Sequence, residues 1–526
     1  MRKNLIALSV AAFVGGLGMA GSATAAVFAD TTAGAATNAT FERLKQSGTG
    51  HQLLVPYFNT QAGNATLFNI VNTDSVHGKA VKVRFRGGSN SDDVFDFQLY
   101  LSPNDVWAAN ISKGPNGVSR LTTIDKSCTL PVGVGSGAGS DFVTARLPQT
   151  LTGDALAAET REGYIEVFNM ADVAAGSALA TAITHVAGTP PCTGAAFLNT
   201  LQTDPADLPA ALAAGLRAPT ATLFANWTIV NVPKSGSATG EAYAITATVS
   251  PTDNTPARGN IVFFPQVAGS VAQPLDLQAI DRYTSDPSLR FTLVTNTGTG
   301  TLPVITASMF DLPDLSTPYL LLAAYPPVAA DPGLFVNHLQ DALATGSISN
   351  EFLTDTSINA FTDWTFSQPT RRYAVSMDYR GLGTSTGAVR LFTTNNSYYN
   401  TTDTSVSGFQ VCVKTGATGV TYYNREELGA VGTSFVISPN PPAPAFALCG
   451  ETSVLTFNAP TGASVLGATI AKTLFSTGTV RDGWAVVSTP GIGSGLPIVG
   501  KSFSAASTGS FNVGGSWEHR YTPTQP

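Results

Sequence analysis

The chain has 526 residues, of which 43% are hydrophobic and 12% are charged, and its formal net charge is −7. The charged content is about half that of an average globular chain. The scarce Lys and Arg residues form no basic stripe, which argues against nucleic acid as a partner. The length suffices for two to four domains, each with its own hydrophobic core.

The N-terminus has the three parts of a secretory signal peptide. Arg2 and Lys3 are followed by an apolar run, Leu5–Met19, and then by an A-x-A sequence at residues 23–25. We predict that residues 1–25 are cleaved, which takes the formal charge from −7 to −9 because two basic residues are lost. The apolar run is too short for a membrane span. We therefore expect an exported chain without a transmembrane segment, at the cell surface or outside the cell, with the periplasm as the alternative.

Alternation of apolar and polar residues recurs along the chain and predicts β-strands. In residues 80–86, for example, Val81, Val83 and Phe85 alternate with three basic residues. Further strands are expected at 95–100, 163–169, 223–232, 242–249, 289–295, 304–310, 373–379, 389–394, 408–414, 453–458 and 483–488. The pattern predicts a multi-domain, all-β fold, mainly antiparallel and sandwich-like, whose strands bury their apolar face and expose their polar face.

One local pattern occurs three times, at residues 65–85, 224–249 and 289–309. Each copy is an apolar strand that ends at Asn, then a turn of small residues, then a returning strand. An internally duplicated domain explains the pattern. Ordinary hairpins explain it equally well, because Asn, Thr and Gly all tolerate turn geometry.

Two helices are expected, at Ala206–Leu216 and Gly333–Ala344, because each follows an Asp-Pro pair that suits a helix start. Both lie between groups of strands. We predict three β-rich domains after the signal peptide, at residues 26–200, 201–366 and 367–526, with boundaries uncertain by ten residues or more.

The four cysteines predict two disulfides in an oxidising compartment. Three pairings are open. We favour Cys128–Cys192 and Cys412–Cys449, because each pair then lies inside one predicted domain. The spacing has no C-x-x-C element, which argues against zinc.

No motif predicts a catalytic residue. Residues 383–387 match the G-x-S-x-G sequence of a nucleophile elbow, but strand-like sequences lie on both sides, where an elbow needs a strand and then a helix. The five histidines are dispersed, so none forms a local metal-binding pair. We therefore expect a protein without catalytic activity.

Two groups of residues suggest binding. Asp92, Asp93 and Asp96 form an oxygen-rich cluster that suits a structural Ca²⁺ ion, or else a solvated loop, and no other cofactor is expected. The second group consists of paired tyrosines in Asn- and Thr-rich surroundings, which either stack on sugar rings or contribute to the core. These tyrosines are Tyr398, Tyr399, Tyr422 and Tyr423.

Three phrases carry a resemblance to a known group of proteins. The first is Val55-Pro56-Tyr57-Phe58 followed by residues 63–67. The second is Thr362-Asp363-Trp364 leading into Pro369-Thr370-Arg371-Arg372-Tyr373, and the third is residues 495–500 followed by residues 515–521, which end in Trp517-Glu518-His519-Arg520-Tyr521. With their neighbours, they resemble Gram-negative exported proteins known only as cell surface proteins. The resemblance implies a surface-associated protein and supplies no site residues.

Three hypotheses for the function follow. The first is an exported cell-surface structural or interaction protein without catalysis, whose partners are other copies of itself or other envelope components. The second is a module that binds glycans or another surface ligand. The third is a secreted hydrolase whose site residues are scattered in sequence.

Overall fold

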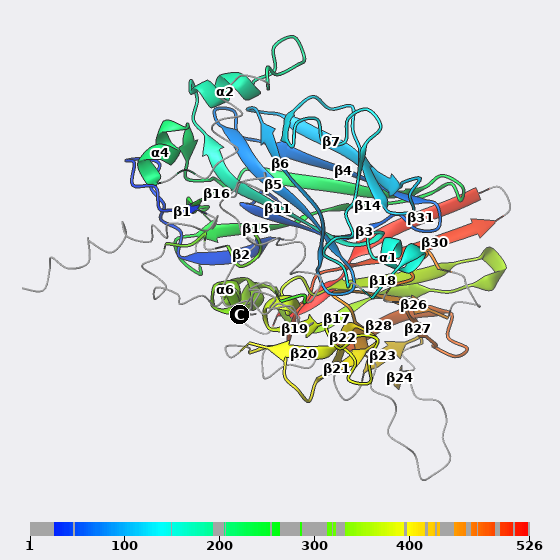
Figure 1. Ribbon diagram of the computed structural model, residues 1–526. Helices are drawn as coiled ribbons and strands as arrows, with labels where there is room; N and C mark the ends of the chain where they lie inside the picture. The colour runs from blue at the N-terminus through cyan, green and yellow to red at the C-terminus, as the bar shows by residue number, and fades with distance from the viewer. Residues whose placement is uncertain are drawn as a thin grey trace, which may run out of the picture.

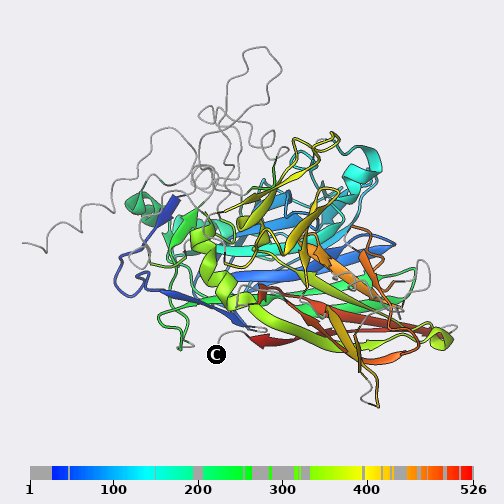
Figure 2. The same cartoon turned by 90° about the horizontal axis from the view of Figure 1, so that it is seen from below.

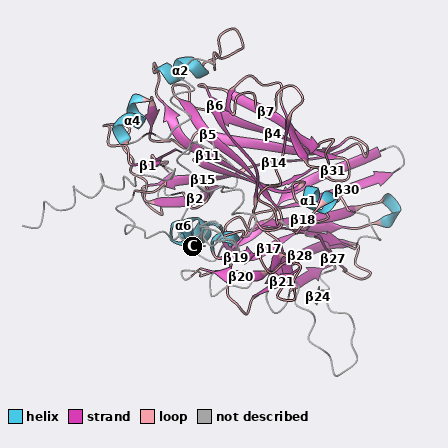
Figure 3. Ribbon diagram, viewed as in Figure 1, coloured by secondary structure: helices cyan, strands magenta, loops and turns pink. Residues whose placement is uncertain are grey.

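The computed structural model describes residues 26–45, 48–148, 150–192, 205, 207–252, 255–263, 284–286, 313–317, 319–321, 332–393, 397–415, 419–426, 429–431, 447–458, 464–470, 472–489, 495–508 and 511–523. The predicted signal peptide, the third copy of the strand-turn-strand pattern and its two predicted strands lie outside these residues. Within them the fold is all-β and mainly antiparallel, as the sequence predicts (Figures 1 and 3).

The N-terminal half forms two large sheets. Its strands are β1 (Ala26–Phe28), β2 (Phe41–Lys45), β3 (Gln52–Asn59), β4 (Asn64–Asn72), β5 (Gly78–Gly87), β6 (Asp93–Leu101), β7 (Val106–Lys113), β8 (Ser119–Thr122), β9 (Cys128–Leu130), β10 (Ser140–Asp141), β11 (Glu162–Val173), β12 (Leu216–Arg217), β13 (Leu223–Asn231), β14 (Gly236–Glu241), β15 (Tyr243–Thr248) and β16 (Ile261–Phe263). Sheet I has the order β2-β15-β3-β11-β5-β6-β9, with β12 paired to β11. Sheet II has the order β10-β8-β7-β4-β13-β14.

Sheets I and II bury one large core between them. Strand β5 contributes to one side of this core through its alternating apolar residues, Val81, Val83 and Phe85. From sheet II come Trp107 and Trp227, both fully buried. This arrangement is the sandwich that the alternation predicts.

The opposite face of sheet I corrects the expectation of exposed polar side chains. Lys82, Arg84 and Arg86 on β5 are almost completely buried. Arg84 Nε lies 3.1 Å from Asp93 Oδ2, and Arg86 Nε lies 3.2 Å from Glu166 Oε2. Burial of a charge is tolerated where an opposite charge and hydrogen bonds accompany it. Sheet I is therefore covered on both faces.

The C-terminal half forms sheets III and IV. Its strands are β17 (Ala344–Leu353), β18 (Phe361–Ser367), β19 (Val375–Asp378), β20 (Val389–Phe392), β21 (Thr404–Ser407), β22 (Gln410–Lys414), β23 (Val420–Tyr423), β24 (Gly429–Val431), β25 (Ala447–Cys449), β26 (Thr452–Phe457), β27 (Lys472–Phe475), β28 (Asp482–Ser488), β29 (Leu496–Pro497), β30 (Lys501–Thr508), β31 (Phe511–Glu518) and β32 (Arg520–Pro523). Sheet III has the order β24-β23-β28-β17-β29, with β32 paired to β17, and sheet IV has the order β27-β26-β18-β30-β31. Two smaller sheets, β19-β20 and β21-β22-β25, complete this half. Sheets III and IV both contribute to a second core, in which the Phe352 and Phe457 rings stack at 4.9 Å.

The sheets cross the predicted domain boundary at residue 200. β13 pairs with β4 over the full length of both strands, and β15 pairs with both β2 and β3. Residues 223–248 therefore complete the sheets of residues 41–173. The first two copies of the strand-turn-strand pattern begin at β4 and β13, which are neighbours in sheet II.

The two predicted helices are present. They are α4 (Leu208–Ala213) and α6 (Pro332–Leu343). The Asp207 side chain accepts a hydrogen bond from the Ala210 amide at 2.8 Å and so caps the start of α4. Two helices not expected from the sequence are α1 (Gly153–Ala158) and α2 (Ala178–Ile183), each a short connection between strands.

Hydrogen bonds join the two halves of the chain. The Arg372 guanidinium donates to the Ser91 carbonyl at 3.0 Å, and the Tyr164 hydroxyl donates to the Pro369 carbonyl at 3.3 Å. β14 of sheet II also lies alongside β31 of sheet IV (Figures 1 and 2). Residues 369–373, part of one of the segments that carry the resemblance, therefore belong to this junction.

Among the described residues, none of the helices has the length and apolar character needed to cross a bilayer.

Candidate functional site

The two disulfides are those that the sequence favours. Cys128 on β9 is bonded to Cys192, with 5.4 Å between their Cα atoms. Cys412 and Cys449 are register partners on β22 and β25, and they are bonded with a Cα–Cα distance of 3.9 Å. Each bond closes a loop within one half of the chain.

The structure gives the three aspartates of the proposed calcium cluster protein partners. Asp92 is buried and accepts a hydrogen bond from the Tyr379 hydroxyl at 2.7 Å. Asp93 Oδ2 lies 3.3 Å from Arg146 Nη1, besides its contact with Arg84. Asp96 forms an ion pair with Lys82.

The pKa values of two of these carboxyls shift in opposite directions. Burial raises the pKa of Asp93, and the neighbouring Asp96 raises it further. Burial would also raise the pKa of Asp96, but the Lys82 ammonium and the Arg84 guanidinium outweigh it and hold that pKa well below its usual range. Because protein cations neutralise the carboxylates, this geometry gives the calcium hypothesis no support.

Three of the four candidate tyrosines are buried in the C-terminal core. Tyr398, Tyr399 and Tyr422 are at most 8% exposed and pack within the second core. The Tyr398 hydroxyl donates to the Asp341 carboxylate. Of the two alternatives that the sequence left open, these three residues therefore follow the second and contribute to the core.

Tyr423 is different, because it points away from the core and stacks on a tryptophan. It follows Tyr422 on β23, so the two side chains lie on opposite faces of sheet III. The Tyr423 ring is stacked on Trp484, with 4.5 Å between ring centroids and 18° between ring planes. Trp484 is 43% exposed. The pair forms an aromatic site on the outward face of sheet III, which we call the Tyr423–Trp484 site.

The register of sheet III explains the pairing. Tyr423 and Trp484 are direct cross-strand partners on β23 and β28, and Glu351 on β17 is the partner of Trp484 on its other side. Across β24 the partner of Tyr423 is Gly429, which has no side chain.

Polar groups border the Tyr423–Trp484 site. Arg425 Nε lies 2.6 Å from Asp482 Oδ2, and both residues are next to the aromatic strands. Glu351 is exposed on the neighbouring strand. The site thus combines an aromatic surface with charged hydrogen-bonding groups at its rim.

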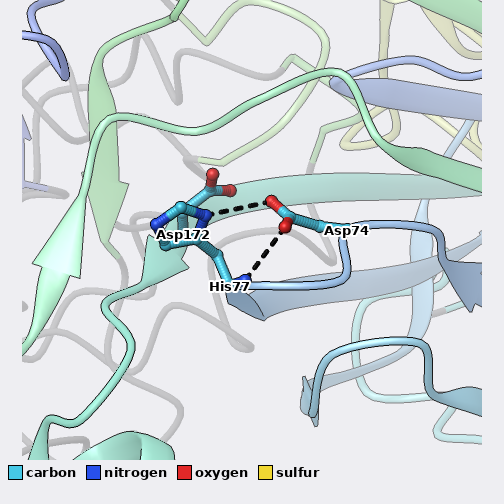
Figure 4. A group of neighbouring side chains, drawn as sticks. All are labelled: Asp74, His77 and Asp172. Atoms are coloured by element: carbon cyan, nitrogen blue, oxygen red, sulfur yellow. Dashed lines mark hydrogen bonds and ion pairs between the residues drawn. The ribbon is translucent and has the colours of Figure 1, made fainter.

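A second group, at one end of sheets I and II, has the composition of a metal site. Asp74, His77 and Asp172 each offer one ligand atom, and these atoms lie within 4.8 Å of one another (Figure 4). The His77 Nδ1 atom lies 3.2 Å from Asp74 Oδ2. The sequence did not reveal this group, because Asp172 is on β11, about a hundred residues after the other two.

A lysine ammonium occupies the position that a metal would take. Lys79 Nζ lies 3.0 Å from Asp74 Oδ2, 2.7 Å from Asp172 Oδ1 and 2.8 Å from the Thr220 hydroxyl. Burial tends to raise the pKa of Asp74, but the hydrogen bond from the His77 amide and the charge of Lys79 hold it well below its usual range. We interpret the group as an ion cluster, buried at Lys79 and Asp172 and partly exposed at Asp74 and His77, that fixes β5, β11 and the segment before β13.

Two buried histidines are also structural. Burial lowers the pKa of His51 to about 4 and that of His519 to about 3, so both rings are neutral at physiological pH. His51 Nδ1 accepts from the Ala247 amide at 3.1 Å, which leaves Nε2 as the donor to the Pro219 carbonyl at 3.2 Å. Both ring nitrogens of His51 are therefore engaged by backbone.

The G-x-S-x-G sequence lies in the connection between β19 and β20, which pair antiparallel. This is the hairpin that the flanking sequences predict.

No family model, no curated protein and no solved structure matches this chain.

Proposed function

We propose that this chain is an exported cell-surface protein that acts by binding a partner at the Tyr423–Trp484 site. Export is supported by the signal-peptide pattern of residues 1–25 and by the two disulfides, which persist in oxidising compartments. The resemblance to exported cell surface proteins supports the location.

The observation that carries the binding role is the exposed aromatic pair. Large aromatic side chains usually find a place in a core, and Tyr and Trp that remain exposed with a polar tip are enriched at contact surfaces. In the same chain Trp107, Trp227 and Trp364 are fully buried, whereas Trp484 and Trp517 are exposed. Trp484 is in addition stacked on Tyr423 and bordered by charged groups, and this combination favours a contact role.

Location is tested by protease treatment of intact cells that express the full chain, together with fractionation of medium, periplasm and outer membrane. Cleavage on intact cells supports the proposal. Protection from protease, with recovery in the periplasm, contradicts the surface location and leaves a periplasmic binding role.

For the partner, we favour a glycan. The apolar C–H face of a sugar ring packs on an aromatic ring, while its hydroxyls need donors and acceptors around that ring. The exposed Trp484 stacked on Tyr423, with Arg425, Asp482 and Glu351 at the rim, provides both.

Glycan binding is tested on a glycan array, followed by calorimetry with the sugars that bind. Trp484→Ala and Tyr423→Ala should each weaken binding by about 10-fold or more, because a desolvated aromatic contact contributes about 1–3 kcal/mol. Trp517→Ala is the matched control, since Trp517 is 53% exposed on β31 of sheet IV. Equal binding by all three variants would contradict the site, and release of free sugar from the bound glycan would favour the hydrolase hypothesis.

A further inference from the structure

The outward face of sheet II is an uncharged surface on three neighbouring strands. The register of β4 with β7 and with β13 places four residues of each strand on this face. They are Val106, Ala108, Asn110 and Ser112 on β7, Ala65, Leu67, Asn69 and Val71 on β4, and Phe224, Asn226, Thr228 and Val230 on β13. We call this set the neutral face.

The neutral face combines apolar ends with an amide and hydroxyl centre. Val106, Val71 and Phe224 form a row at one end, and Ala65 and Val230 lie at the other. Leu67 is 43% exposed and Val106 is 48% exposed, so no element among the described residues covers these side chains. Charges lie on the flanking strands: Glu241 on β14 borders Asn226, and the Arg120–Asp141 ion pair of β8 and β10 borders Ser112.

The size of the neutral face suits a protein partner. The face spans three strands that are up to nine residues long. Strand spacing of about 4.8 Å and a rise of about 3.4 Å per residue give about 400 Å² of projected area. Side chains corrugate this area, which brings its accessible surface toward the roughly 600 Å² that each partner contributes to a small interface.

The net charge of the chain favours a second copy of the same chain as the partner. The formal net charge is −7, so two copies repel each other through most orientations. A face without charges is the place where they approach without that repulsion. Two neutral faces are also complementary to each other, because both offer apolar side chains at their ends and amides that can exchange hydrogen bonds.

We propose that two copies of this protein associate through their neutral faces, sheet II against sheet II, in an isologous contact. This inference deepens the proposed role as a surface interaction protein and rests on it. It is tested on purified protein in solution, so its failure is distinguishable from failure of the surface location or of glycan binding.

The experiment places a charge at the centre of the neutral face. Sedimentation velocity is measured over a concentration series for the mature protein, for Leu67→Asp and for Leu67→Lys. Like charges face each other in the variant dimers. The dissociation constant of each variant dimer should therefore be about 100-fold higher than that of the wild-type dimer. The control is Leu474→Asp, because Leu474 is 62% exposed on β27 of sheet IV and should leave the association unchanged.

Mixing the two variants separates an interface effect from misfolding. An equimolar mixture of Leu67→Asp and Leu67→Lys should regain dimers, since opposite charges then meet across the contact. Wild-type protein that remains monomeric at every concentration overturns the proposal. Dimers that persist in both single variants, or a mixture that stays monomeric, overturn it as well and assign the neutral face to another occupant.

Discussion

Tyr243 on β15 donates a hydrogen bond to Glu518 on β31 at 2.6 Å, although 275 residues separate them in the chain. The Tyr243 hydroxyl also lies 3.1 Å from the Tyr521 hydroxyl. Burial raises the pKa of Tyr243 well above its usual value, so it remains a donor at any physiological pH. The bond ties sheet I to the last strands of the chain.

The first prediction follows from this junction. We expect Tyr243→Phe to lower the free energy of unfolding by about 1–3 kcal/mol, because it leaves the buried partner groups of the hydroxyl with fewer hydrogen bonds. We also expect the two halves to unfold in one calorimetric transition. Two separate transitions in the wild type would instead support independent domains.

The second prediction concerns the ion cluster around Lys79. Lys79→Ala removes the ammonium and leaves Asp74, His77 and Asp172 with ligand atoms close enough to share an ion. Zinc takes such nitrogen and oxygen ligands with water as the fourth. Zinc should raise the melting temperature of Lys79→Ala, and Lys79→Ala/His77→Ala should lose the effect. A similar rise in the wild type would contradict the role assigned to Lys79.

The third prediction concerns the disulfides, which span 64 and 37 residues. Loop closure of this length corresponds to about 4 kcal/mol of stabilisation for each bond. Cys412→Ser/Cys449→Ser and Cys128→Ser/Cys192→Ser should each lower the midpoint of chemical unfolding. Thiol titration of the unfolded, unreduced protein should detect no free thiol, because all four cysteines of the chain are paired.

The fourth prediction concerns pH. Burial raises the pKa of Glu162 to about 7, although the Thr469 and Ile470 amides and the Gln61 side chain lower it in part. The folded state then holds a proton that the unfolded state releases at about pH 4.5, so stability falls as pH rises from about 4.5 to 7. The shift corresponds to about 3 kcal/mol.

Glu162→Gln should remove this part of the pH dependence, as measured by urea unfolding at several pH values. Glu351→Gln, on the exposed face of sheet III, is the control and should keep the pH dependence of the wild type. If the free energy of unfolding of Glu162→Gln falls with pH as steeply as that of the wild type, the pH dependence arises from another group. Glu159 is one such group, because burial also raises its pKa to about 7.

The local features of the fold could be predicted from the sequence. Alternation located the regular strands of the core such as β5, β11 and β13, and an Asp-Pro pair marked the start of α6. Helix α4 begins after Asp207, three residues beyond its Asp-Pro pair, and the placement of each cysteine pair within one predicted domain identified both disulfides. Each of these signals lies within a short stretch of chain or depends on a small number of cysteines.

Features that depend on strand register could not be predicted. Lys82 and Arg84 look solvent-exposed in sequence, because Asp93 and Asp96 become their partners only when β6 pairs with β5. Tyr423 likewise meets Trp484 only through the pairing of β23 with β28. The boundary at residue 200 was drawn where the sequence has no strand, whereas β13 returns to β4 beyond it.

The pairing of β4 with β13 also constrains the order in which the protein can fold. Until residue 231 is available, β4 lacks one neighbour, and β3 lacks β15 until residue 248 is available. An emerging N-terminal segment therefore has open strand edges and an incomplete core. The sandwich closes only after nearly half of the chain is available, so its non-local strand pairs, rather than local hairpins, should set the pace of folding.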